Sequence, residues 1–249
     1  MIEYIAIFVG ILPAALLVGF IYWKDKYQRE PWKWIGKAVK YGMLAAVTAI
    51  FFEFLLPRAG NTGLSACIYN AFIVAAIPEE CMKLLFFWLL VRKNPFFDEH
   101  MDGIVYACCV SMGFAGLENI LYLLGNLDSL ATTALLRAFL SVPGHFFFNV
   151  FMGYYYSLAI FGNPAHKTRN LTLALLTPVL LHGAFDFFLM SMPLSPEWSA
   201  LSFILLLLLC CYYWKYGRRR IHTLLEMDRQ KTVTGTEDAE ETGYNKKER

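Results

Sequence analysis

The sequence predicts an all-α protein, a polytopic integral membrane helix bundle of about seven transmembrane helices with its N-terminus outside and its C-terminus in the cytoplasm. Composition is the first reason, since 57% of the 249 residues are hydrophobic and only 17% are charged, whereas soluble domains carry about a quarter charged residues. The second is a series of apolar stretches long enough to cross a bilayer. The third is the placement of basic residues in alternate loops, which sets the orientation.

Seven apolar segments are the predicted spans, at residues 2–23, 34–56, 64–91, 102–125, 130–161, 169–192 and 197–216. The first has no basic residue before its apolar core and is long enough to span, so we expect a membrane anchor rather than a cleaved signal peptide. Lysines and arginines follow the first, third, fifth and seventh segments, whereas the opposite loops carry almost none, Arg58 being the exception. Because basic loops stay in the cytoplasm, the N-terminus is predicted to lie outside.

The predicted membrane domain covers residues 1–217, and residues 218–249 form a separate cytoplasmic tail. From Asp228 onward this tail is polar, mixed in charge and poor in large hydrophobic residues, which is typical of disordered chain. The arginines at 218–220 fit either binding of anionic lipid headgroups or a stop-transfer role. The six cysteines lie inside apolar segments without metal-binding spacing, so we expect small core residues and no disulfide framework.

Ionisable side chains inside the predicted spans are the strongest functional signal, because each costs at least ~2.5 kcal/mol at membrane depth on insertion scales. The third to sixth segments carry Glu79, Glu80 and Lys83, then Glu118 and Asn119, then Arg137, His145 and Asn149, then His182 and Asp186. Two other acids receive different interpretations. Glu53 lies near the outer end of its helix, where we expect it to reach the interface, and Asp102 is expected to be an N-cap.

Helical spacing gives the intramembrane residues a geometry. Residues four apart share a helix face, which pairs His182 with Asp186 and His145 with Asn149. In each pair the acid or amide is placed to fix the imidazole tautomer or to share a ligand with it. Glu79 and Glu80 differ by about 100° around the helix axis, so one of them points into a central cavity while the other faces a neighbouring helix or Lys83.

Prolines precede the polar residues of three spans, at positions 78, 143 and 178. A proline removes one backbone hydrogen bond and tends to kink its helix, and membrane proteins tolerate such breaks where they line a cavity.

Arg137 and Glu118 each lie about seven residues, or roughly 10 Å of helix, from the turn that joins their two spans. Because an unpaired arginine at this depth is costly, the similar depths predict an ion pair between them.

At these positions the chain resembles the PrsW family of bacterial intramembrane proteases, within the larger group that contains the CAAX-prenyl-protease-like enzymes. The similar elements are E-E-x-x-K at 79–83, D-G-I-V-Y at 102–106, G-F-A-G-L-E-N at 113–119, Arg137, P-G-H at 143–145 and H-G-A-F-D at 182–186. Each pattern is weak alone, but their order on successive predicted helices over residues 20–190 is specific. The prenyl proteases usually show E-E-x-x-x-R, and the lysine one residue earlier argues against a prenylated substrate.

The resemblance implies an endopeptidase of the bacterial plasma membrane that cleaves a single-span, membrane-anchored anti-sigma factor. In the family this is site-1 cleavage on the extracytoplasmic side, within a stress-response cascade. The resemblance implies catalytic roles for Glu79, Glu80, His145 and His182, with Glu118, Asn149, Asp186, Lys83 and Arg137 supporting.

An ion-coupled membrane transporter, a CAAX-type protease with a different substrate and a catalytically silent scaffold are the alternatives. Seven spans without visible repeat symmetry fit poorly with inverted-repeat transporters. The sequence offers no Gly-rich phosphate loop and no groove-reading motif, so we expect no nucleic-acid partner.

Two ways of activating the hydrolytic water stay open. Zinc prefers histidine nitrogen and carboxylate oxygen with an open fourth position, and His145, His182 and Glu80 are the candidate ligands. In the metal-free alternative, Glu80 or Glu79 polarises the water and the histidines stabilise the oxyanion. No H-E-x-x-H motif indicates a metal, and the neighbouring Lys83 cation slightly favours the metal-free site.

Overall fold

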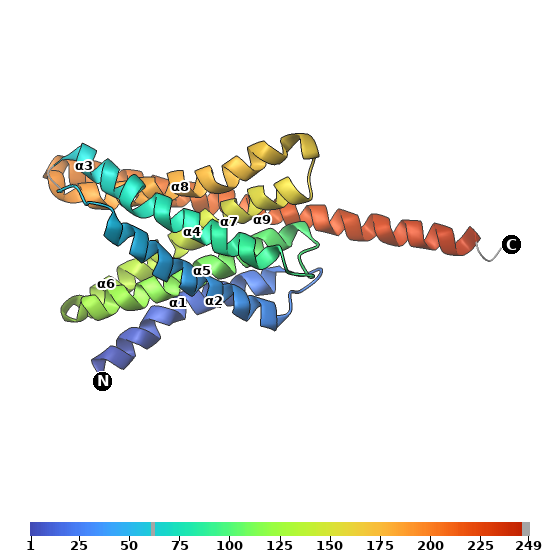
Figure 1. Cartoon of the computed structure of the whole chain (residues 1–249), viewed down its shortest axis with the longest axis horizontal. Coiled ribbons are helices and arrows are strands. Elements are labelled where there is room, and N and C mark those ends of the chain that lie inside the picture. Colours follow the sequence, from blue (N-terminus) through green and yellow to red (C-terminus); the bar gives the residue numbers. More distant parts are fainter. Residues whose placement is uncertain (61–62, 246–249) are drawn as a thin grey trace.

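The computed structural model describes residues 1–60 and 63–245, and this part of the chain is helical without a β-strand (Figure 1). The elements follow in the order α1 (Ile2–Lys24), α2 (Trp32–Leu55), α3 (Leu64–Ile68), the π-helix η1 (Tyr69–Ala76), α4 (Ile77–Val91), α5 (His100–Gly125), η2 (Leu127–Ser129), α6 (Leu130–Leu136), the π-helix η3 (Arg137–Ser141), α7 (Val142–Ile160), η4 (Pro164–His166), α8 (Lys167–Ser191), η5 (Met192–Leu194) and α9 (Pro196–Asn245).

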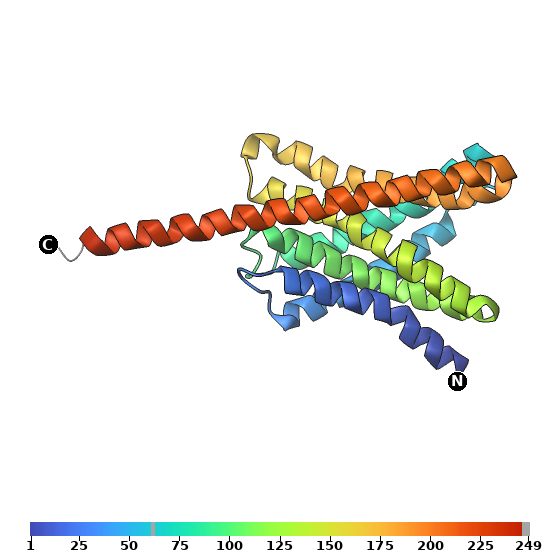
Figure 2. The same cartoon turned by 180° about the vertical axis from the view of Figure 1, so that it is seen from behind.

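Six helical stretches are long and apolar enough to cross a membrane, which confirms the polytopic all-α class. The predicted span at 64–91 is not among the six, although α3, η1 and α4 make it one continuous helical run. It carries Glu79, Glu80 and Lys83 close together, more charge than a span of ordinary composition tolerates. The chain start and the far end of α9 lie at opposite ends of the bundle (Figures 1 and 2). Seven spans would produce this arrangement, and the count and the orientation stay predictions.

Helix α5 is the central helix of the bundle. Every residue from 101 to 116 is buried, and the helix packs against α1, α2 and α7. Glycines bring α2 and α5 together, because a Cβ at Gly42 would lie 1.8 Å from the carbonyl oxygen of Val110, and one at Gly113 would lie 2.0 Å from that of Val39. Small residues of this kind let membrane helices approach closely. The contact fixes the position of α5, which carries part of the site.

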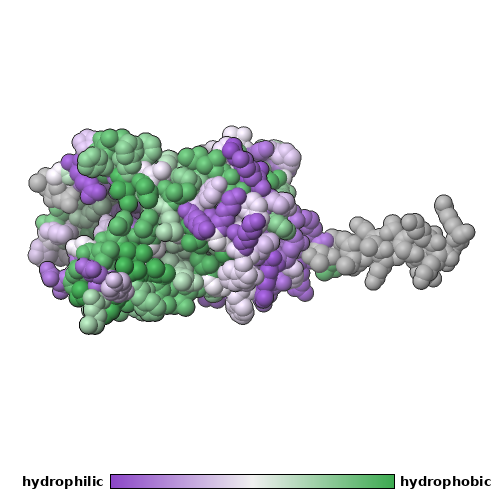
Figure 3. All heavy atoms as spheres, turned by 60° about the horizontal axis from the view of Figure 1, so that its bottom comes forward, coloured by the Kyte–Doolittle hydropathy of each residue, from purple (hydrophilic) through white to green (hydrophobic). Residues whose placement is uncertain are grey.

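The outside of the bundle is apolar. Large hydrophobic side chains such as Phe54, Phe139 and Leu208 are exposed. Figure 3 shows hydrophobic residues over much of the bundle, with hydrophilic residues gathered at the end from which α9 projects. Water-soluble monomers rarely expose contiguous apolar surface of this extent. The surface therefore fits a lipid bilayer.

Helix α9 continues through residues 218–245, and the division of the chain into a membrane domain and a tail stays a prediction. Asp228, only 1% exposed, accepts hydrogen bonds from the backbone N–H groups of His100 at 2.9 Å and Met101 at 2.8 Å. The first backbone N–H groups of a helix have no partner within that helix, so α9 caps α5. Helix α9 therefore contacts the membrane domain as far along the chain as Asp228.

The start of α5 differs slightly from the expectation for Asp102. Glu99 is the N-cap of α5, and Asp102 lies three residues further on, in a capping box with it. Asp102 Oδ2 accepts the backbone N–H of Glu99 at 2.7 Å. Asp102 is thus a helix-capping residue, although not at the N-cap itself.

Candidate active site

Most of the polar residues of the predicted spans line a single cavity of about 910 Å³ between α2, η1, α4, α5, η3, α7 and α8. Its wall includes Glu79, Glu118, Arg137, His145, His182 and Asp186. Glu80, Lys83 and Asn149 are fully buried around it. At the end of the bundle that holds the chain start, the wall ends at Arg58 and Asn126, which are exposed. The cavity therefore extends from the buried polar residues to that surface.

Two π-helical turns position the residues that follow them. Helix η1 ends just before α4, whose first turn contains Pro78, and η3 ends just before α7, whose first turn contains Pro143. Proline has no backbone N–H, and in both places the chain continues through wide turns instead of breaking. A π turn also shifts the helix phase. The helix face on which the next polar residues lie therefore depends on these turns.

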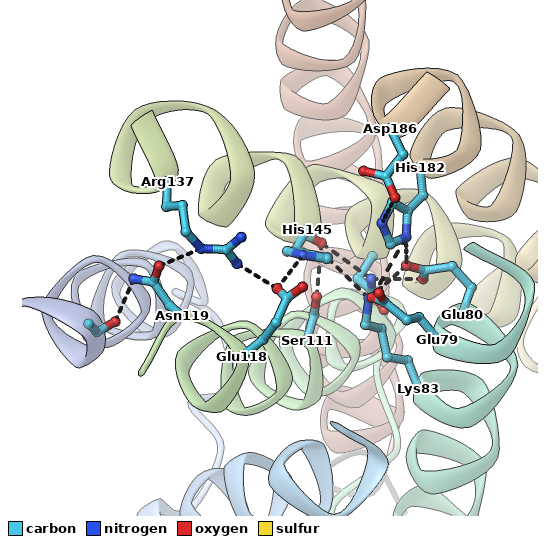
Figure 4. A network of polar contacts seen from close by, with 12 residues as sticks. Glu79, Glu80, Lys83, Ser111, Glu118, Asn119, Arg137, His145, His182 and Asp186 are labelled. Carbon is cyan, nitrogen blue, oxygen red and sulfur yellow. Dashed lines mark hydrogen bonds and ion pairs between the residues drawn. The ribbon is translucent and has the colours of Figure 1, made fainter. Parts of the chain in front are cut away.

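Lys83 lies beside both glutamates of the network in Figure 4. Its Nζ donates to Glu79 Oε2 at 3.1 Å and to Glu80 Oε1 at 2.8 Å, and it lies 3.1 Å from His145 Nδ1. The same Nζ is 4.0 Å from the ring centroid of Phe114, a favourable cation–π distance. Glu79 and Lys83, four residues apart on α4, thus form an ion pair, and Glu80 shares the same cation.

His182 joins the two glutamates to Asp186. Its Nδ1 lies 2.9 Å from Glu80 Oε1 and 3.9 Å from Glu79 Oε2, and its Nε2 lies 3.3 Å from Asp186 Oδ2. The predicted i, i+4 pair of His182 and Asp186 is confirmed. Because both ring nitrogens face carboxylate oxygens, either the imidazole carries two protons or one of the carboxyl groups carries one.

His145 has a defined tautomer in this arrangement. Its Nδ1 faces the Lys83 ammonium, which only donates hydrogen bonds. The ring proton therefore lies on Nε2, which donates to Glu118 Oε2 at 3.0 Å. The rings of His145 and His182 are 5.0 Å apart. Helices α7 and α8 thus bring the two histidines, 37 positions apart in the sequence by their numbers, into one site.

Arg137 and Glu118 form the predicted ion pair, with Arg137 Nη2 2.7 Å from Glu118 Oε2. Arg137 Nε also donates to Asn119 Oδ1 at 2.7 Å, and Asn119 Nδ2 donates to the carbonyl oxygen of Gly10 in α1 at 2.9 Å. The guanidinium lies 4.0 Å from the ring centroid of Tyr122. These contacts hold α1, α5 and η3 in register beside His145.

The i, i+4 spacing suggested that Asn149 sets the tautomer of His145, but the Asn149 side chain has other partners. Its Nδ2 donates to Glu80 Oε2 at 3.2 Å and to the backbone carbonyl of His145 at 3.2 Å. Glu118, on another helix, takes the role instead. The spacing did not give the correct partner, because the Asn149 amide donates to the Glu80 carboxylate of another helix and to the backbone of its own.

Three contacts were missed by sequence reasoning. Ser111 Oγ donates to the carbonyl oxygen of His145 at 2.9 Å, and the Phe148 ring stacks on His182 with centroids 5.4 Å apart. Asn119 lay within the family-like pattern but received no role. A serine or a phenylalanine in an apolar span does not by itself indicate a functional role. An asparagine next to Glu118 at membrane depth does indicate one.

The site also has the donors of a metal centre. One ligand atom each from Glu79, Glu80, His145 and His182 lies within 4.8 Å of the others. Two carboxylates and two imidazoles form a donor set that zinc accepts, so these residues fit a divalent ion. Lys83 Nζ contacts three of the four groups. An ammonium cannot ligate a metal, so loading requires Lys83 to withdraw from them.

Comparison with known proteins gives consistent matches. Residues 30–213 match the family model described as PrsW family intramembrane metalloprotease. The chain is 36% identical to Protease PrsW of Bacillus subtilis (strain 168) over 183 residues, which cover 74% of this chain and 82% of that protein. It is 38% identical to Protease PrsW of Geobacillus kaustophilus (strain HTA426) over 184 residues, 73% of this chain and 78% of the relative. Protease PrsW of Clostridioides difficile (strain 630) is 38% identical over 184 residues, 73% of this chain and 77% of the relative. No solved structure shows a significant match to the chain.

Proposed function

Because the chain belongs to the PrsW family of intramembrane metalloproteases, we propose that it cleaves a single-span, membrane-anchored anti-sigma factor. The chain is a multi-pass membrane peptidase. The finer proposal is site-1 cleavage, on the extracytoplasmic side, in a stress-response cascade. It combines the resemblance with the position of the cavity, which ends at the surface predicted to lie outside.

The observation that carries the proposal is the set of acids and imidazoles at the cavity wall. Peptide hydrolysis needs a base for the water, an acid for the leaving amine and a donor for the oxyanion. Glu79, His182 and His145 all line the cavity, so each can reach a bound peptide. One nitrogen or oxygen atom of each lies within 4.8 Å of those of the other two, close enough for a single water to bridge them.

Glu79 is the better candidate for the base, because its carboxylate lines the cavity whereas Glu80 is fully enclosed. Glu79 would position the attacking water and take its proton. His182, which faces acids through both nitrogens, would protonate the leaving amine. His145 would direct its Nε2 proton toward the oxyanion from the Glu118 side.

Glu80 then acts as a positioning residue. It accepts from Lys83, from Asn149 and from the ring of His182, so it orients three groups without meeting substrate. A divalent ion, when bound to Glu79, Glu80, His145 and His182, would supply a polarised water and a Lewis acid. The proton transfers assigned to Glu79 and His182 are those of the metal-free site, because a lone pair that binds an ion cannot also accept a proton.

The test is cleavage of candidate single-span substrates by the purified protein in liposomes, with the cleaved bond mapped by mass spectrometry. Glu79→Gln keeps the shape of the side chain but removes the base, so we expect kcat to fall by ~10²–10⁴, the usual contribution of general-base catalysis. Glu197→Gln, a change at an exposed glutamate of α9, is the matched control and should cleave normally. Wild-type rates in the Glu79→Gln protein would refute the assignment.

Metal content and cleavage, measured on the same samples before and after a strong chelator, decide how the water is activated. Activity lost on chelation and restored by stoichiometric zinc assigns activation to the metal. Unchanged cleavage by metal-free protein assigns it to Glu79 alone. An anti-sigma factor left intact while other single-span proteins are cleaved would contradict the proposed substrate but not the peptidase.

A further inference from the structure

We infer that Glu53 forms a specificity subsite, which binds a lysine or arginine side chain of the substrate near the cleaved bond. The inference rests on the proposed peptidase function and adds to it a substrate preference. We expected Glu53 to reach the membrane interface, but it lies on the wall of the cavity that holds Glu79 and His182.

Glu53 belongs to a helix face that leads into the site. Ala46 and Ile50 of α2 line the same cavity, and residues three to four apart share a helix face. The Glu53 side chain is 17% exposed, so the protein encloses most of it while part stays accessible. A peptide that reaches Glu79 through this cavity therefore passes beside a carboxylate.

Each of the other carboxylates on the cavity wall lies close to a cation or a histidine nitrogen that the protein largely encloses. These pairs are Glu79 with Lys83 at 3.1 Å, Glu118 with Arg137 at 2.7 Å and Asp186 with His182 at 3.3 Å. The ion pair of Glu53 is of another kind, because Arg58 lies 3.7 Å away and its side chain is 72% exposed. Solvent-exposed ion pairs add little stability. Glu53 is thus the cavity carboxylate with the most weakly held cation.

Arg58 is placed so that it can leave Glu53 without moving its loop. The next residue, Ala59, is held at both backbone polar groups by Asn70, which accepts the Ala59 N–H at 2.9 Å and donates to its carbonyl at 2.7 Å. Only the Arg58 side chain has to swing away. A substrate cation can therefore replace it, at the cost of one weak, exposed contact.

The exchange favours a basic peptide side chain over a neutral one. A carboxylate enclosed without a cation is costly, and a peptide that fills the cavity would exclude water from Glu53. An ion pair formed by the substrate in that setting is stronger than the exposed pair it replaces. Substrates with an acidic residue at the same position would be rejected by like charge.

The experiment uses substrates that differ at one position, carrying Lys, Gln or Glu, with the position scanned along the residues that flank the cleaved bond. The readout is kcat/KM in liposomes. We expect the wild type to prefer Lys over Gln roughly tenfold at one position, equivalent to about 1.4 kcal/mol. Glu53→Gln should abolish this ratio, and Glu53→Lys should reverse it in favour of the Glu substrate.

Two further variants separate the subsite from general damage. Arg58→Ala removes the competing cation, so KM for the Lys substrate should fall about two- to threefold. Asp128→Asn removes an exposed carboxylate in the turn after α5 and should leave all ratios unchanged. The inference is overturned if Glu53→Gln slows the Lys, Gln and Glu substrates by one common factor, or if the wild type shows no preference at any position.

Binding distinguishes failure of the subsite from failure of the proposed function. Dissociation constants of the Lys and Gln peptides are measured for wild type and Glu53→Gln. If the wild type cleaves nothing but binds the Lys peptide more tightly, and Glu53→Gln loses that preference, the subsite stands and the peptidase proposal fails. If neither cleavage nor binding depends on the charge of the substrate side chain, the subsite is refuted and the peptidase proposal is unaffected.

Discussion

Replacing Gly42 by alanine tests whether the contact between α2 and α5 positions the site. Gly42 lies in the middle of α2, and its Cα faces the backbone of α5. α2 carries Glu53 and α5 carries Glu118, both on the cavity wall. The smallest possible side chain therefore enters the contact that sets the distance between these two walls.

The size of the perturbation follows from the structure. The added Cβ would lie 1.8 Å from the carbonyl oxygen of Val110, whereas ordinary contacts begin at 3.4 Å. The two backbones must separate by 1.6 Å, since 3.4 minus 1.8 is 1.6. Overpacking of this kind costs about 1–3 kcal/mol. A displacement near 1 Å at a catalytic site costs about 100-fold in rate, so we expect both stability and cleavage to fall.

Gly36→Ala is the matched control in the same helix. Gly36 is exposed, and a Cβ there meets nothing within 4 Å. Alanine is the better helix former by about 0.8–1 kcal/mol, so this variant should be as stable as the wild type or more stable. The assays are thermal unfolding in detergent and kcat/KM in liposomes. A Gly42→Ala protein that matches Gly36→Ala in both assays would refute the reasoning.

Three further expectations concern charged residues. Arg137→Ala leaves Glu118 without its cation, and breaking an enclosed ion pair costs about 3–5 kcal/mol, so Tm should drop. Arg137→Lys should recover part of the loss, and an unchanged Tm in Arg137→Ala would contradict the pairing. Burial, with Glu30 nearby, raises the pKa of Asp25 from 3.8 to about 7. The folded protein therefore binds a proton between about pH 4 and 7 that the unfolded chain has lost, and stability falls as pH rises through that window. Asp25→Asn should accordingly raise Tm more at pH 8 than at pH 5, and an equal gain at both would refute the assignment. Asp228→Ala removes the acceptor that caps α5, worth about 0.5–2 kcal/mol, so limited proteolysis should cut the end of α9 faster than in the wild type.

The residues of the site were largely predictable from the sequence. A charge at membrane depth is expensive and needs a function or a partner, so Glu80, Lys83 and His182 are conspicuous in apolar spans. Their meeting in one cavity followed from their order on successive helices. The Arg137–Glu118 pair was predictable for a related reason, since depth along antiparallel helices can be counted from the turn between them.

Other features of the site could not be read from periodicity. The sequence left open whether Glu79 or Glu80 faces the cavity, and it placed Glu53 at the interface. It also paired Asn149 with the wrong group. Each error concerns the direction in which a helix face points. The helix spacing of side chains is local, but the rotation of a helix in the bundle is set by its neighbours.

The sequence by itself determined the all-α membrane class and the identity of the polar residues, because bilayer solvation penalises each charge separately and therefore marks it. Only the tertiary structure decided which partner each charge has. The wide turns of η1 and η3 shift the helix phase ahead of Glu79 and His145, and the close approach at Gly42 sets how far α2 lies from α5. Both effects arise from packing between helices, and no periodicity within a single helix records them.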